Sequence, residues 1–153
     1  MKRIARAIRR LRRAPATRRV AAAVAVRPDG AGGVEFLLVR TSNGERWTFP
    51  KGGRERGETL AQAAAREAVE EAGALGRVGE QPIGAYPYGD DLVTAFLLEV
   101  DATRAPREDG RTPTWFGPRA AGDKLAEGRD RGFRERMEHL LLEAQQAAGA
   151  TVK

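Results

Sequence analysis

Three glutamates, Glu67, Glu70 and Glu71, stand three and four residues apart near the middle of the chain. On a helix this spacing places their carboxylates on one face, with Cβ atoms roughly 5–6 Å apart. Like charges at i and i+4 destabilise a helix by about 0.2–0.5 kcal/mol per pair, so the cluster needs a counter-charge. Arg66 can reach Glu70 at i+4, but it neutralises only one of the three carboxylates.

A divalent cation would supply the missing positive charge. Oxygen ligands with open positions suit Mg²⁺ or Mn²⁺, which keep part of their water and take further oxygens from a phosphate. Glu58 is a fourth carboxylate, in a loop that could fold back to the same face. The residues alone leave two interpretations open: a metal site, or a charged and solvated helix face.

The element that must carry this cluster is a helix over residues 60–72. Thr59 and Gln62 form a capping box before it, and Gly73 is a typical C-terminal stop. Its other face is expected to pack closely on a sheet and to leave the glutamates facing outward. That face is built from small residues, namely Ala61, Ala64, Ala65, Ala68 and Ala72.

Apolar runs separated by turn residues predict the sheet. Residues 18–27 and 34–40 are expected to form a hairpin, and residues 51–57, rich in glycine, are expected to be a loop. Further strands are predicted at 47–49, 81–88, 92–101 and 114–116, and a last helix at 132–147. Strands interleaved with helices indicate an α/β sandwich with a mixed sheet.

Charge divides the chain into a basic arm, residues 1–17, and one domain, residues 18–153. The net charge is +6, yet residues 1–19 hold nine Lys or Arg and no acid, so the rest is slightly acidic. The arm can be a flexible solvated segment, a helix docked on the body or a partner, or a segment that binds nucleic acid or an anionic surface. The oligomeric state stays open.

Composition excludes several kinds of site. The 153 residues include no cysteine and one histidine, His139, which rules out disulfides, thiolate ligands and a multi-histidine zinc site. No apolar run is long enough for a membrane span, and the start lacks the core of a secretory signal. We therefore expect a cytoplasmic protein without a membrane span.

The segment from Gly52 through Glu58 to Arg66-Glu67-Ala68-Val69-Glu70-Glu71-Ala72-Gly73-Ala74 resembles the Nudix box at every charged and glycine position. The preceding Trp47-Thr48-Phe49-Pro50-Lys51 is similar to the stretch that leads into the box in many members. The resemblance implies an α/β/α sandwich with a central mixed sheet. It also implies a Mg²⁺- or Mn²⁺-dependent hydrolase that cleaves diphosphate linkages.

The resemblance also implies residue roles. Glu67 and Glu71 would be metal ligands, and Glu70 a shared ligand or the base that activates water, with Glu67 as the other candidate base. The backbone carbonyl of Lys51 would be a further ligand, and Arg66 would hold a glutamate in position. A carboxylate within hydrogen-bond reach of a bound water can take its proton.

The substrate depends on residues outside the box. Basic residues that flank the expected site could bind phosphates, namely Arg18, Arg19, Arg40, Arg46 and Lys51. Tyr86 and Tyr88 could stack on a base, although core packing is expected for at least one of them. A late Arg111 with Trp115 and Phe116 adds to a resemblance to the branch that cleaves diadenosine polyphosphates and diphosphoinositol polyphosphates.

Other functions stay open. The chain can be a different Nudix pyrophosphatase, acting on ADP-ribose, an oxidised nucleotide or an RNA 5′-end, or a nucleotide-binding regulator without turnover. The acidic loop residues Asp90, Asp91, Glu108 and Asp109 could each approach a metal, but acidic loops are common. His139 and Trp115 are expected to be structural residues.

Overall fold

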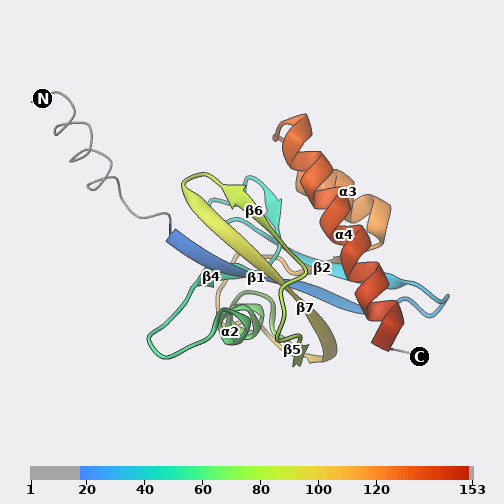
Figure 1. Cartoon of the computed structure of the whole chain (residues 1–153), viewed down its shortest axis with the longest axis horizontal. Coiled ribbons are helices and arrows are strands. Elements are labelled where there is room, and N and C mark those ends of the chain that lie inside the picture. Colours follow the sequence, from blue (N-terminus) through green and yellow to red (C-terminus); the bar gives the residue numbers. More distant parts are fainter. Residues whose placement is uncertain (1–17, 152–153) are drawn as a thin grey trace, which may run out of the picture.

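The computed structural model describes residues 18–151, and its side chains up to residue 149 (Figure 1). A mixed sheet of eight strands separates α2 on one face from α3 and α4 on the other, which confirms the predicted α/β/α sandwich. The predictions for the arm, residues 1–17, lie outside the described part. The elements are β1 (Arg18–Pro28), β2 (Val34–Arg40), β3 (Trp47–Thr48), β4 (Lys51–Gly53), α2 (Leu60–Ala72), β5 (Ala74–Val78), β6 (Gly84–Tyr88), β7 (Asp91–Thr103), β8 (Thr114–Phe116), α3 (Pro118–Ala126) and α4 (Arg131–Thr151).

Strand β1 is the centre of the sheet and is buried on both faces. It pairs in parallel with β7 and antiparallel with β2 and β4. Its even-numbered residues from Val20 to Val26 pack in the core under α3 and α4, and Ala21, Ala23 and Ala25 pack under α2. A strand covered on both sides needs a continuous apolar run, and this strand has one.

Helix α2 begins and ends where the sequence predicts. The Thr59 hydroxyl accepts the Gln62 N–H at 3.1 Å, and the Gln62 side chain accepts the Thr59 N–H at 2.9 Å. Gly73 has a φ of 63°, and a β-carbon there would overlap the Arg104 carbonyl. Both the left-handed backbone and the close approach of a second chain segment therefore require glycine.

Alanines of α2 lie against the sheet, as expected, except that Ala63 takes the buried position predicted for Ala65. Ala63 is fully buried, whereas Ala65 is only half-buried. The prediction that the glutamates face outward is wrong for Glu67 and Glu71, which are 8% and 4% exposed. This face of the helix is covered by other parts of the chain, described below.

Several boundaries also differ from the prediction. Residues 51–53 form β4, which pairs with β1, instead of belonging to a loop. Strand β5 and helix α3 are not predicted from the sequence, and β6 begins at Gly84 instead of residue 81. Pairing with a long neighbouring strand extends β7 and supports short β5, and this tertiary support has no local signal.

Over residues 18–151, no helix is both long and apolar enough to cross a membrane.

Candidate functional site

Arg66 is the centre of an acidic network on α2. Its guanidinium forms a two-point ion pair with Glu58, with N–O distances of 2.9 and 3.0 Å. It also donates to Glu67 at 3.0 Å and to Glu70 at 3.3 Å, and its remaining hydrogen bond goes to the Gly53 carbonyl at 2.9 Å. One arginine therefore fixes two glutamates of the helix and the loop that precedes it. The Glu58 loop folds back as expected.

Strand β4 covers the Glu67 carboxylate. Residues alternate along a strand, so Gly52 faces α2 together with Ala21, its partner on β1, and Lys51 faces the α4 layer together with Ala22. A β-carbon at Gly52 would overlap the Glu67 carboxylate. The glycine therefore gives Glu67 its place between helix and strand.

A loop outside the helix adds a further carboxylate. The Arg104 N–H donates to the Gly73 carbonyl at 2.8 Å, and the Glu108 N–H donates to the Glu70 carbonyl at 3.0 Å. These bonds dock the segment after β7 on the C-terminal end of α2. As a result, carboxylate oxygens of Glu67, Glu70 and Glu108 lie within 4.8 Å of one another.

Glu71 is held differently from Glu67 and Glu70. Its carboxylate accepts the Lys51 backbone N–H at 3.1 Å and lies 3.4 Å from the Arg111 guanidinium. Arg111 also binds Glu108 at 2.9 Å and donates to the Arg40 carbonyl at 3.2 Å. Arg111 thus joins Glu71 to Glu108, the residue that completes the carboxylate group. We call Glu67, Glu70, Glu71 and Glu108, with Arg66 and Arg111, the glutamate site.

Burial and charge act against each other in this site. Burial raises the pKa of Glu71 to about 7, although Arg111 and the Lys51 N–H oppose the shift. Burial also raises the pKa of Glu67, against the effect of Arg66. The hydrogen bond from Arg66 lowers the pKa of Glu58 and raises that of the arginine itself. Burial therefore favours the neutral forms of Glu67 and Glu71 unless a further positive charge is present.

The residues present fit a hard divalent cation. Together with Glu55 and Glu58, six carboxylates share two guanidinium groups. The three carboxylates that converge offer only oxygen ligands, which Mg²⁺ and Mn²⁺ prefer. An added cation would neutralise charge that the network leaves uncompensated.

The predicted phosphate-binding residues are dispersed by the fold. Lys51 and Tyr88 come together, with the Lys51 Nζ 4.2 Å from the Tyr88 ring centroid. The Arg40 guanidinium lies over the Trp47 ring at 4.2 Å, and that of Arg18 lies against Gly53. Arg19 is exposed near the start of β1. Arg46 lies against Gly128, in the turn between α3 and α4.

Arg129 is a contact residue that the sequence does not predict. Its guanidinium donates to the Trp47 and Leu125 carbonyls at 2.9 and 2.7 Å and to the Tyr88 hydroxyl at 2.8 Å. Arg111 was noticed only as part of a resemblance, and Glu108 only as one of several acidic loop residues. No short spacing in the sequence links these residues to α2, so the signal lies in the tertiary fold.

Other singled-out residues are structural. Tyr86 is buried in the core, where burial raises its pKa, so it is not a base-stacking residue. Trp115 packs against the core with Arg27 over its ring at 4.1 Å. His139 is exposed on α4, 3.8 Å from Glu143.

Comparisons with known proteins agree with this arrangement. The family model for the NUDIX domain matches residues 17–137. The chain is 32% identical over 104 residues to Nudix hydrolase 13, mitochondrial, of Arabidopsis thaliana, covering 58% of this chain and 52% of that protein. It is 48% identical over 91 residues to Nudix hydrolase 17, mitochondrial, of the same plant, covering 54% and 50%. The chain therefore spans about half the length of these curated relatives.

A crystal structure of a C. elegans Ap4A hydrolase binary complex is also similar. It superimposes with a TM-score of 0.66 at 26% identity, over 88% of this chain and 99% of that one.

Proposed function

Because this chain belongs to the Nudix family, we propose that it hydrolyses phosphoanhydride linkages in small molecules with the help of Mg²⁺ or Mn²⁺. The observation that carries the proposal is the convergence of Glu67, Glu70 and Glu108 beside two arginines. A binding protein without turnover has no need for a cluster of carboxylates that repel one another.

Glu67, Glu70 and Glu71 would hold the cation, with the Lys51 carbonyl as a further ligand, and Glu108 is added by its position. When bound, the cation neutralises phosphate oxygens and lowers the pKa of a coordinated water. Glu71 lies nearest to Arg111 and Lys51, so its part is to tie β4 to the helix as well as to supply an oxygen.

Glu70 is the proposed general base, with Glu67 as the other candidate. The carboxylate accepts a proton from the attacking water, whose oxygen bonds to phosphorus as the bridging P–O bond breaks. Arg66 holds both carboxylates from one side, which fixes their orientation. Arg66 is therefore a positioning residue.

Dinucleoside polyphosphates or diphosphoinositol polyphosphates are the proposed substrates. The likeness to an Ap4A hydrolase over nearly the whole of that chain supports this choice. Several basic side chains are available to bind phosphates, namely Arg18, Arg19, Arg40, Arg46 and Lys51, with Tyr88 beside Lys51.

Chromatography of the products formed from a panel of these compounds, ADP-ribose, an oxidised nucleotide and a 5′-triphosphorylated RNA tests the proposal. We expect cation-dependent turnover of the polyphosphates, and a loss of about 10²–10⁴-fold in kcat for Glu70→Gln. Glu80→Gln, an exposed change outside the network, is the matched control and keeps its activity. Full activity of Glu70→Gln would contradict the assigned base, and turnover of none of these compounds would contradict the function.

A further inference from the structure

We propose that a cavity between the end of β6 and the start of α4 binds phosphate groups of the substrate that lie beyond the cleaved linkage. This inference rests on the proposed function for the identity of the ligand. The structure shows the cavity, its charge, and the contacts of Lys51 with Tyr88, which lines the cavity, and with Glu71 of the glutamate site.

The cavity has a volume of about 580 Å³ and is bordered by three arginines, Arg46, Arg129 and Arg136. They come from the loop before β3, the turn between α3 and α4, and α4 itself. We call it the arginine cavity. Its one acidic lining residue, Asp130, accepts the Phe133 backbone N–H at 2.8 Å at the start of α4. The lining therefore carries a net positive charge.

These three arginines have no carboxylate partner within residues 18–149. Arg129 donates to two backbone carbonyls and a hydroxyl, none of which neutralises its charge. In contrast, neighbouring arginines of α4 do have partners: Arg131 pairs with Glu135, and Arg134 pairs with Glu138. Unpaired guanidinium groups around one hollow are suited to phosphate, which they can bind through two hydrogen bonds each.

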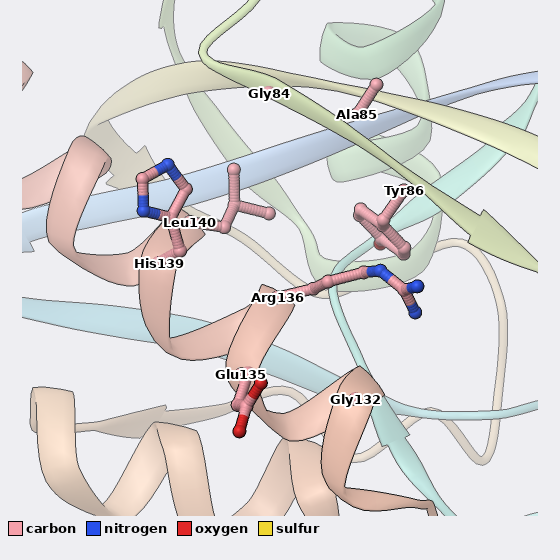
Figure 2. Close-up of a pocket in the computed structure, with 8 residues that line it drawn as sticks. All are labelled: Gly84, Ala85, Tyr86, Gly132, Glu135, Arg136, His139 and Leu140. Carbon is pink, nitrogen blue, oxygen red and sulfur yellow. The ribbon is translucent and has the colours of Figure 1, made fainter.

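Arg136 borders the cavity from the side of α4. Figure 2 shows its side chain reaching from the helix towards β6, with the guanidinium near Tyr86 and pointing away from Glu135 and His139. The same residue borders a second groove of about 360 Å³ along α4. Its exposed charge is therefore free to meet a ligand in the arginine cavity.

The contacts of Tyr88 favour a phosphate over a nucleobase as the ligand of the arginine cavity. The Lys51 ammonium lies 4.2 Å from its ring centroid, and Arg129 holds its hydroxyl. Phe133 stands beside the same ring at 6.2 Å. A ring whose face is covered by an ammonium group does not offer that face to a base, but it does hold two cations in place for an anion.

Lys51 connects the arginine cavity to the glutamate site. Its backbone N–H binds Glu71, and its side chain reaches Tyr88 on the opposite face of β4. In the proposed binding mode, a phosphate chain that reacts at the glutamates continues past Lys51 towards the arginines. Long polyphosphates would gain contacts that a diphosphate ester does not reach.

Binding of inorganic tripolyphosphate, measured by calorimetry without a divalent cation, tests the cavity directly. We expect the wild-type protein to bind it, and the double variant Arg46→Gln/Arg136→Gln to bind at least about tenfold more weakly. Within residues 18–149 neither side chain forms a hydrogen bond or an ion pair that the variant would lose, so the variant is expected to keep the wild-type Tm. Arg129 is left in place because it connects four elements.

Two variants serve as controls: Arg119→Gln alone, and the double variant Arg77→Gln/Arg119→Gln. Both arginines are exposed and lie outside the cavity lining. The combined control removes two positive charges, as the test variant does, and is expected to bind within about twofold of wild type. Equal losses in the two double variants, unchanged binding after the cavity change, or no binding by the wild type would each overturn the proposal.

Turnover provides the second measurement. Across dinucleoside polyphosphates of increasing phosphate number, the cavity variant should show a KM that rises by about tenfold for the longest and by less for ADP-ribose. An equal rise for all substrates would contradict the proposal. Calorimetry needs no turnover, so tripolyphosphate binding by an inactive protein would separate failure of the proposed function from failure of this inference.

Discussion

The glutamate site and the arginine cavity lie on opposite faces of β4. They differ in whether their guanidinium groups are paired with carboxylates. In the glutamate site every guanidinium is shared among carboxylates, and Arg66 alone contacts Glu58, Glu67 and Glu70. In the arginine cavity the cations contact carbonyls, rings or solvent. The first region is arranged to hold a cation, and the second is arranged to hold an anion.

Their construction differs as well. Most of the glutamate site comes from one helix and the loop before it, whereas the cavity collects single residues from distant parts of the chain. The carboxylates are thus mostly concentrated in one short segment, whereas the cavity depends on how the layers pack. Substitutions in the two regions should therefore have different effects on activity, stability and cation binding.

Among the changes that compare the two regions, Gly52→Ala is expected to have the largest effect. The added methyl group meets the Glu67 carboxylate and must displace it or β4, and such displacements cost about 10²-fold in rate. kcat/KM on the best substrate measures the loss. Gly117→Ala is the matched control, because nothing lies within 4 Å of a β-carbon there. Full activity of Gly52→Ala would show that the Glu67 position is not critical.

Arg111→Met is expected to lower the free energy of unfolding by up to about 3 kcal/mol, because it leaves the buried Glu71 without its cation. Urea unfolding of the metal-free protein measures this difference. Arg111→Lys keeps the charge and should lose less. If both variants match the wild type, the link between Glu71 and Glu108 contributes no stability.

The stabilisation by a bound cation should depend on the glutamate site and not on the arginine cavity. A cation at a hundred times its Kd stabilises a one-site protein by about 2.7 kcal/mol, so Mg²⁺ or Mn²⁺ should raise the Tm. Glu67→Gln should remove most of this rise, whereas Arg136→Gln should retain it. A rise of the same size in Glu67→Gln would place the cation elsewhere.

The smallest effect concerns the core beside the cavity. Burial raises the pKa of Tyr86, so its neutral form is favoured in the folded protein. The stability that this provides is complete below the unfolded pKa of about 10 and is lost as the pH rises above it, by about 1.4 kcal/mol per unit. Tyr86→Phe should lose less stability between about pH 10 and 11 than the wild type, as measured by urea unfolding. Identical pH profiles would contradict the shift.

Local signals explain which features the sequence could predict. Helix α2 is predicted to the residue because Thr59, Gln62 and Gly73 each act within a few positions of its ends. The long strand β1 is predicted almost as well, because both of its faces are buried and its apolar run is continuous.

Features that depend on contacts between distant segments could not be predicted in the same way. Strand β4 has two glycines and no propensity for a strand, and it forms because β1 offers a partner and Glu67 needs the space. Glu108 reaches the glutamates through backbone hydrogen bonds to α2, which no side-chain pattern encodes. Arg129 acts on Tyr88, which lies 41 positions earlier in the chain.

The segment after β7 is docked on α2, so its length determines where Glu108 lies. Arg104 and Glu108 are each fixed to α2 by one backbone hydrogen bond, so the three residues between them set where the carboxylate of Glu108 arrives. A single insertion there would shift the spacing and withdraw this oxygen donor while the helix stays intact. The position of the Glu108 carboxylate can therefore be altered by changing chain length in one loop, without changing Glu67, Glu70 or Glu71.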